Sequence, residues 1–446
     1  MLPPELLSAI FTEYLAPEPT RTRLPRFAAR FPCVPQTAAD PFVLGQVCSY
    51  WRGVASNTPA LWTRMVLKRP KMSHLARARL WLERAAPLGC NVLLDGSDVP
   101  GREELNASRI LLCMLLDQCA DVPRGLEIYG SSRIFEGVAF GSGASRLTSA
   151  LIHVSDLEEV VGAQETLDSV WEWLHTTAPL LKSADWGTLY GDHLPSHAPW
   201  SQLEAVRIEA PVDLEELFNI LPQCTQAKSI HINNLSEPLP SFEPPTSSLR
   251  LANLENLHVV MSQPSSDLFF QGLTLPKLEE LSVLHYDPEE SRRYPQAFRE
   301  FMERSGCVLH SFKFMDECLN EDDLIGWLDA PGTYDVRVLG LDIRGSVISQ
   351  RLLDRLVRSD KPDGKKELLP HLESMEVAVC DFPEGRLAKL IRSRQGELSF
   401  VSVMMASDVE GYFLEDVKAI RDLCTDDDSR MAIWDLETGQ PRILTT

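Results

Sequence analysis

Hydrophobic and polar positions alternate in one short pattern that recurs through most of the chain. The pattern is Φ-x-x-Φ-x-Φ, where Φ is hydrophobic. It occurs as "LEAVRI" at 203, "AKSIHI" at 227, "LENLHV" at 254, "LEELSV" at 278, "LHSFKF" at 309, "VRVLGL" at 336, "LESMEV" at 372 and "LSFVSV" at 398. Weaker copies are "LTSALI" at 147 and "LKSADW" at 181. The alternation predicts strands with one buried face.

Amphipathic segments separate these strands, and successive strand patterns start 24 to 36 residues apart. The predicted helices are Leu214–Leu221, Pro295–Arg304, Asp322–Leu328, Arg351–Arg358 and Leu387–Arg394. One strand and one helix per repeat of this size is typical of a leucine-rich-repeat solenoid, here a degenerate one. Helical crossovers make such strands parallel, which predicts an α/β solenoid with a curved parallel sheet. The alternative is a doubly wound α/β domain. Repetition of a single strand motif favours the solenoid.

The first 70 residues have a different, helical pattern. "LPPELLSAIFTEYL" places Leu6, Leu7, Ile10, Phe11, Tyr14 and Leu15 at helical spacing. Residues 16–41 contain six prolines and four arginines, which excludes a regular element. Asp40 is the predicted N-cap of a second helix over 41–55, and Asn57–Pro59 ends it. Leu61 and Trp62 begin a short packed segment, and a further helix is predicted over Ser73–Ala86.

The composition indicates a globular protein whose net charge disfavours binding to polyanions. Of 446 residues, 44% are hydrophobic and 24% charged, and the net charge is −21, which disfavours nucleic acid or an anionic membrane as a partner. Residues 1–70 hold eight Lys or Arg and four Asp or Glu, a net of +4, so the remainder carries −25. The N-terminal segment is therefore electrostatically distinct from the repeats.

The sequence contains few features that indicate a cellular compartment, a metal or a cofactor. No run approaches the ~18 apolar residues of a membrane span, and no signal peptide is recognisable, so we expect a cytoplasmic or nuclear protein. The ten cysteines include no C-x-x-C and are interpreted as reduced, mostly buried thiols. His193 and His197 flank Pro195, which favours a loop over a metal site. "GSG" at 141–143 lacks the residues of a phosphate loop. No metal, cofactor or catalytic residue is predicted.

The N-terminal residues resemble an F-box. The resemblance rests on Leu2, Pro3, Glu5, Leu6, Leu7, Ile10, Phe11 and Leu15, followed by Asp40, Leu44, Val47, Cys48, Trp51, Arg52, Ala55, Leu61 and Trp62. "LWLERA" and "RSGCVLHSFKF" are similar to segments of F-box proteins of mushroom-forming fungi. Unlike the family, which separates the two halves by a few residues, this chain places residues 16–39 between them. That segment is either a looped-out insertion or an unspliced intron.

The resemblance implies a domain organisation in which different segments of the chain have different functions. Residues 1–70 would be the F-box, 71–122 a helical linker and first repeat, and 123–446 a leucine-rich-repeat-like solenoid that binds the substrate. In the family, the F-box docks on a Skp-type adaptor and through it on a cullin–RING ubiquitin ligase. By this resemblance Leu2, Pro3, Leu6, Leu44, Val47 and Trp51 would face the adaptor, whereas Ile10 and Phe11 would hold the helices together.

The expected function is therefore that of a non-catalytic substrate-recognition subunit of an SCF-type ubiquitin ligase. An alternative is a repeat scaffold that binds the adaptor without a role in ubiquitination. A third class, a hydrolase or transferase within an α/β domain, lacks a supporting local motif. Position five of each strand pattern faces away from the core, and its basic members are Arg207, His231, His258 and Lys313. These residues are the candidate contacts to an acidic or phosphorylated substrate segment; the alternative is a solvated sheet of chance composition.

Overall fold

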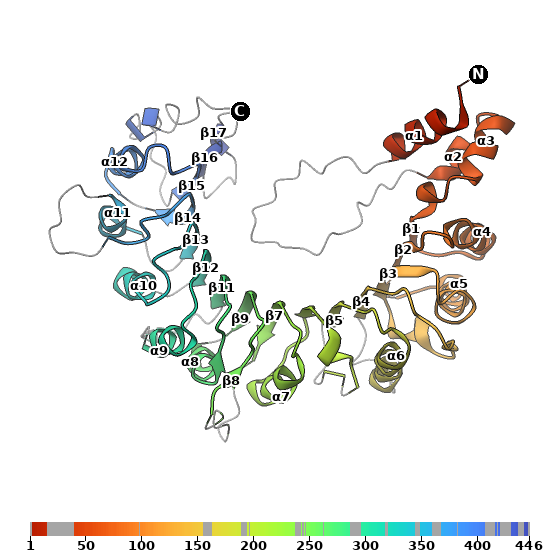
Figure 1. Ribbon diagram of the computed structural model, residues 1–446, viewed down its shortest axis with the longest axis horizontal. Coiled ribbons are helices and arrows are strands. Elements are labelled where there is room, and N and C mark those ends of the chain that lie inside the picture. Colours follow the sequence, from red (N-terminus) through yellow and green to blue (C-terminus); the bar gives the residue numbers. More distant parts are fainter. Residues whose placement is uncertain are drawn as a thin grey trace. The chain divides into compact units, whose positions relative to one another are not determined.

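The protein is described by a computed structural model of the chain (Figure 1). The described residues are 2–15, 40–97, 99–154, 163–188, 194–195, 197–236, 242, 245, 247–261, 263–285, 296–316, 320–343, 348–358, 367–380, 382–405, 415–416, 418–419, 430–435 and 441–444. The predicted insertion 16–39 and His193 lie outside them. Chain contacts divide the protein into two compact units, Met1–Pro211 and Val212–Thr446. The boundaries expected at 70 and 122 both fall inside the first unit.

Unit 1 begins with helices and continues as strand–helix repeats. Its helices are α1 (Pro4–Leu15), α2 (Pro41–Leu44), α3 (Ser49–Ser56), α4 (Leu75–Ala85), α5 (Arg102–Cys113) and α6 (Ala163–Thr177), with short 3₁₀ turns η1 (Pro59–Trp62) and η2 (Met72–His74). Its strands are β1 (Arg64–Lys68), β2 (Cys90–Asp95), β3 (Pro123–Gly130), β4 (Ser149–Val154), β5 (Ser183–Thr188) and β6 (Ala205–Ile208). Each described strand pairs in parallel with the next along the chain.

Unit 2 repeats the same organisation. Its helices are α7 (Leu214–Ile220), α8 (Gln263–Gln271), α9 (Gln296–Ser305), α10 (Glu321–Leu328), α11 (Gln350–Leu356) and α12 (Arg386–Ser393). Its main sheet contains β7 (Ser229–Leu235), β9 (Asn256–Met261), β11 (Glu280–His285), β12 (Ser311–Asp316), β13 (Val338–Ile343), β14 (Ser374–Cys380), β15 (Phe400–Met405), β16 (Arg430–Asp435) and β17 (Pro441–Leu444). Only the last pair of these described strands, β16 and β17, is antiparallel. A small second sheet pairs β8 (Leu249–Arg250) with β10 (Leu273–Thr274).

Strand order distinguishes the two predicted architectures. Within each unit the described strands succeed one another in sequence order, without the reversal of a doubly wound sheet. Helices α4 to α6 of unit 1, and α7 to α12 of unit 2, cover a single face of their strands (Figure 1). The protein is thus an α/β protein with a large parallel sheet, and the prediction of stacked strand–helix repeats is confirmed. Strands β1, β2 and β3 were not predicted, and β1 lies inside the segment expected to be helical.

All ten predicted strand patterns are strands, and their hydrophobic positions face the helices. In β12, for example, Phe312 and Phe314 are fully buried while Lys313 between them is half-buried. A backbone arrangement recurs where each strand starts. Two successive N–H groups, such as those of His310 and Ser311, donate to one carbonyl oxygen of the preceding repeat, that of Glu279. The same pair of bonds recurs at Val338, Ser374 and Phe400, so the main chain fixes the register of successive repeats.

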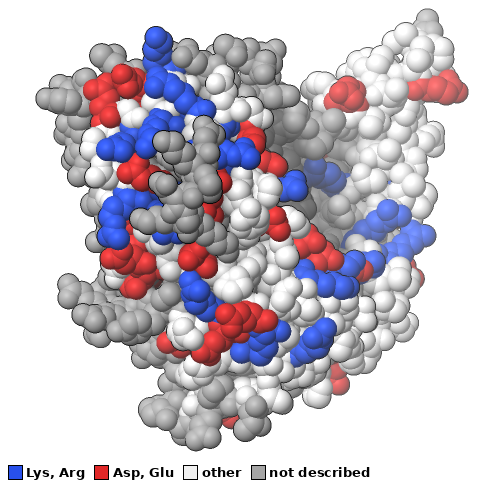
Figure 2. Space-filling model, turned by 60° about the vertical axis from the view of Figure 1, so that its left-hand side comes forward, with Lys and Arg blue, Asp and Glu red and all other residues white. Residues whose placement is uncertain are grey.

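Helix starts and ion pairs complete each repeat. Asn320 caps α10 by accepting a hydrogen bond from the Asp323 N–H at 2.9 Å. Arg351 of α11 pairs with Asp322 of α10 at 2.6 Å, and Arg386 of α12 pairs with Asp354 of α11 at 3.1 Å. Figure 2 shows basic and acidic side chains of the described residues interspersed over one face of the molecule rather than segregated. Charges of opposite sign therefore compensate one another locally on that face.

Candidate functional site

Helix α1 is hydrophobic on two faces. Leu7 and Phe11, four residues apart, are only 2% and 1% exposed. Leu6, Ile10 and Tyr14 form a second row at the same spacing, and they are 55%, 51% and 66% exposed. The first row anchors the helix to unit 1. The second row has no core to enter among the described residues.

Contacts with α3 fix the position of α1. The rings of Phe11 and Trp51 meet edge-on with centroids 4.9 Å apart. The Tyr50 hydroxyl donates a hydrogen bond of 2.6 Å to the Leu2 carbonyl, so the start of α1 lies beside α3. Exposed Leu2 therefore extends the outward row of α1 toward the α3 surface.

The helix expected over 41–55 is broken in two. Asp40 caps α2 as predicted, accepting the Phe42 N–H at 2.9 Å. The chain then turns at Gly45–Val47, and Cys48 begins α3 with extended backbone angles (φ −160°, ψ 170°). The prediction of one continuous helix was wrong, because the turn bonds of Gly45, Gln46 and Val47 replace the helical ladder. As a result Val43 and Val47 are 50% and 60% exposed.

An aromatic cluster joins the N-terminal helices to the first repeat. The Trp62 indole donates to the Ala55 carbonyl at 2.9 Å, and the Trp81 indole donates to the Trp62 carbonyl at 2.7 Å. Phe42 packs edge-on against both indoles, and the Arg77 guanidinium lies over the Phe42 ring. The side chain of Trp62 therefore packs in the interior, whereas Leu6, Ile10 and Tyr14 of α1 and Val43 of α2 are exposed.

The residues expected to face an adaptor fall into three groups. Leu2, Pro3, Leu6 and Val47 are exposed, and Trp51 is half-buried against Phe11. Leu44 is only 5% exposed, so its side chain belongs to the core. Ile10 and Phe11 were both expected to hold the helices together. Phe11 is buried against Trp51 as expected, but Ile10 lies in the exposed row, because α1 turns Leu7 and Phe11 inward. Tyr14 and Val43 are also exposed, although the sequence did not single them out as surface residues; the four-residue spacing from Leu6 through Ile10 includes Tyr14.

The basic position-five residues are divided between the units. In unit 1, Arg207 is paired with Asp185 at 3.6 Å and with Glu209 at 2.5 Å, and its side chain is 13% exposed. Asp185 occupies position five of the neighbouring strand β5 and is the direct register partner of Arg207. The charge of Arg207 is therefore matched within the sheet, which makes Arg207 a weaker candidate for contact with an acidic substrate.

In unit 2 the other three residues share one outward row. His231 and His258 stack with ring centroids 3.9 Å apart, and the His258 Nδ1 lies 2.9 Å from the Ser282 hydroxyl. Lys313 lies beside Ser282 in the register of the next strand. The row therefore brings two imidazoles, a hydroxyl and an ammonium group to the face that the described helices of unit 2 leave uncovered (Figure 1).

Burial shifts the acid groups on the corresponding face of unit 1. Burial, with a smaller contribution from the nearby Glu209 carboxylate, raises the pKa of Asp185 to about 7, although the Arg207 guanidinium opposes the shift. Burial likewise raises the pKa of Glu127. The Asp185 Oδ1 atom has no hydrogen-bond partner among the described residues. Ionising Asp185 is therefore less favourable in the folded protein than in water, mainly because its carboxylate is buried.

The thiols and possible metal ligands give no sign of a reaction centre in the described part of the chain. Burial raises the pKa of Cys90 and of Cys224 to about 12, and that of Cys307 to about 11. Cys48, interpreted with the other thiols as mostly buried, is exposed at the start of α3, where its sulfur accepts the Trp51 N–H. The described residues contain no cluster of three His, Cys, Asp or Glu side chains suited to a metal ion. Nor does any helix in the described segments have the length and apolar character needed to cross a membrane.

Compared with known proteins, the chain matches no family model and no curated protein.

Proposed function

We propose that this chain is the non-catalytic substrate-recognition subunit of an SCF-type ubiquitin ligase and acts in the cytoplasm or nucleus. Residues 2–15 and 40–62 would dock as an F-box on a Skp-type adaptor. The observation that carries the proposal is the exposed row of Leu6, Ile10 and Tyr14 on a helix whose other apolar face is already buried. Burying one such side chain is worth about 1.5–3 kcal/mol, so a row of three favours a protein partner.

The exposure pattern refines the proposed docking residues. Leu2, Pro3, Leu6 and Val47 remain from the expected set, with the accessible edge of Trp51. Ile10, Tyr14 and Val43 join them, because each is at least half exposed and lies on the same short helices. Leu44 supports the surface from beneath. Cys48 is exposed at the start of α3, but no catalytic role is proposed for it or for any other residue.

Capture of a purified Skp-type adaptor by the full-length chain tests the docking. Ile10→Glu should weaken capture by at least about tenfold, since a charge replaces a side chain at the proposed interface. Thr12→Glu is the matched control, because Thr12 is exposed on the opposite side of α1. Equal capture by wild type and Ile10→Glu would contradict the F-box proposal.

A scaffold that binds the adaptor without ubiquitination is the second candidate. The exposed row of α1 fits it equally well. The two functions differ in the steps after docking: a substrate receptor retains a cullin with the adaptor and directs ubiquitin to bound proteins. Adaptor capture without a cullin or ubiquitin transfer would favour the scaffold.

The proposed substrate surface is the outward row of unit 2 formed by His231, His258 and Lys313. The ammonium group of Lys313, and the imidazoles of His231 and His258 when they are protonated, can donate charge-assisted hydrogen bonds to a carboxylate or phosphate. Affinity purification with ligase activity blocked should recover proteins that Lys313→Glu fails to recover. Lys277→Glu is the control, because Lys277 is exposed and lies outside the strand row. If Lys313→Glu recovers the same proteins as the control Lys277→Glu, this row is not the substrate surface.

A further inference from the structure

Strand β1 has one edge paired in parallel with β2 and one edge, here called the open edge, that pairs with no strand of the described residues. The Asn91 N–H donates to the Thr63 carbonyl at 2.8 Å, and the Arg69 N–H donates to the Asp95 carbonyl at 2.7 Å. Alternate residues of a parallel strand bond to the same neighbour. The N–H and C=O groups of Arg64, Val66 and Lys68 therefore point toward the open edge.

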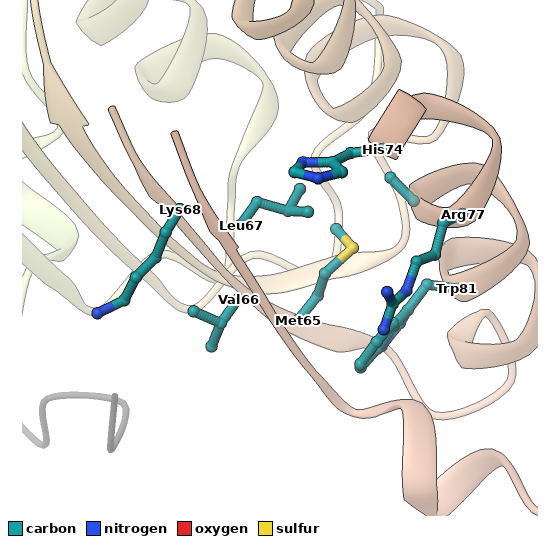
Figure 3. Close-up of a pocket in the computed structure, with 8 residues that line it drawn as sticks. Met65, Val66, Leu67, Lys68, His74, Arg77 and Trp81 are labelled. Carbon is teal, nitrogen blue, oxygen red and sulfur yellow. The ribbon is translucent and has the colours of Figure 1, made fainter. Parts of the chain in front are cut away.

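A pocket of about 130 Å³ lies along this edge. Its lining includes four consecutive residues of β1, from Met65 to Lys68, and no residue of β2. Consecutive strand residues point to opposite faces, so only a pocket on the edge away from β2 can contact all four. His74 and Arg77 approach the pocket from the η2–α4 segment, opposite Leu67 and Met65 (Figure 3).

The surroundings of the edge are basic in an acidic protein. Residues 64–84 contain seven Lys or Arg and a single acid, Glu83, whereas the whole chain has a net charge of −21. Lys68 is weakly paired, with its Nζ 3.9 Å from the Asp95 carboxylate and its side chain 43% exposed. Arg77 contacts Asp40 but remains exposed. The His74 Nδ1 accepts the Lys71 N–H at 3.3 Å, which leaves Nε2 as the donor of the neutral ring.

We propose that the open edge of β1 binds an extended acidic peptide segment of a partner protein by strand addition. Its main chain would pair with Arg64, Val66 and Lys68, and alternate side chains would enter the pocket beside His74 and Arg77. A peptide is favoured over nucleic acid because the edge offers amide donors and carbonyl acceptors at strand spacing, which only another strand matches. A second copy of β1 would bring two basic segments together, and like charges across a strand pair repel.

The test uses the full-length chain and a fluorescein-labelled heptapeptide of alternating glutamate and valine, with fluorescence polarisation as the readout. We expect saturable binding that weakens as salt rises, and no binding of the lysine–valine analogue. Val66→Pro removes the N–H at the centre of the open edge and should weaken binding about tenfold or more. Val66→Ala retains that N–H and should bind as wild type does.

A charge variant keeps the proposal testable even if Val66→Pro is poorly folded. Lys68→Glu with His74→Glu should abolish binding, whereas Arg79→Glu, on an exposed residue outside the pocket, should leave it largely intact. Ile10→Glu should not affect it, since adaptor docking uses a different surface. Unchanged binding by folded Val66→Pro, equal binding of the lysine analogue, or a β1-dependent dimer would each overturn the proposal. The proposal would also be overturned if duplex DNA displaced the labelled peptide and Val66→Pro did not change the binding of that peptide.

Discussion

The phenyl ring of Phe11 packs edge-on against the indole of Trp51, and this contact joins α1 to α3. Phe11 is 1% exposed, whereas Trp51 is only half-buried. Trp51 thus has two possible roles, one in holding the helices together and one at the proposed adaptor surface. Loss of adaptor capture in a Trp51 variant would not separate these roles, which is why Ile10 is the better test of docking.

A double-mutant cycle should detect the Phe11–Trp51 contact. Phe11→Ala and Trp51→Ala together should cost less than the sum of the single changes, with a coupling of about 0.5–1.5 kcal/mol. Amide hydrogen exchange of α1 measures the local free energy of opening. Phe11→Ala combined with Trp186→Ala, at a tryptophan in the distant strand β5, should be additive. Additivity of the Phe11–Trp51 pair would show that the ring contact contributes no stability.

Two adjacent leucines of α1 should differ sharply in their contribution to stability. Leu7→Ala should destabilise α1 by about 2–4 kcal/mol, because Leu7 is 2% exposed and its truncation leaves a cavity. Leu6→Ala should change stability by less than about 0.5 kcal/mol, because Leu6 is 55% exposed. Hydrogen exchange of α1 again provides the measurement. Similar destabilisation by both would mean that the outward row is buried within the protein itself.

Asp185 should make unit 1 less stable as pH rises. The folded pKa of its carboxyl, about 7, lies above the ordinary value of 3.8, so between these values the folded state holds a proton that the unfolded state has lost. Stability from this group therefore falls across that window by an amount on the order of 2–4 kcal/mol. Asp185→Asn should be more stable than wild type at pH 8, with the difference shrinking toward pH 5.

Denaturation midpoints at pH 5, 7 and 8 provide the comparison for Asp185. Asp117→Asn is the matched control, because Asp117 is exposed in the π-helical segment Met114–Gln118 that follows α5. It should leave the pH profile unchanged. A parallel shift of the Asp185→Asn midpoint at all three pH values would show that Asp185 does not titrate in this range.

Arg394 should be a structural residue rather than a surface charge. It is 1% exposed, and its guanidinium donates to the carbonyls of Leu356, Leu368 and Pro370 at 2.8–3.1 Å. Burial lowers the pKa of Arg394. Arg394→Met should destabilise unit 2 by about 3–5 kcal/mol, since three buried carbonyls would lose their donor.

Arg392 provides the control for Arg394 within the same segment. It is exposed, and Arg392→Met should change the unfolding midpoint by much less. Equal midpoints for the two variants would mean that the three carbonyls find other donors when Arg394 is removed.

Local patterns located the ten strands that carry the Φ-x-x-Φ-x-Φ pattern. "LHSFKF" predicted that Phe312 and Phe314 face the core with Lys313 between them, and β12 has that arrangement. Side-chain alternation along a strand is a property of neighbouring residues, so the sequence alone is enough to assign it. The same holds for Asp40, whose carboxylate caps the helix that starts at the next residue.

Contacts between residues that are far apart in the sequence were decided only by the tertiary structure. The salt bridge of Arg207 depends on the register that places Asp185 opposite it on the neighbouring strand β5. The turn at Gly45–Val47 buried Leu44 and exposed Val47, although helical periodicity placed both on one face. The open edge of β1 depends on which strands lie beside it. Periodicity assigns a residue to a face, but only the packing of distant segments determines what that face meets.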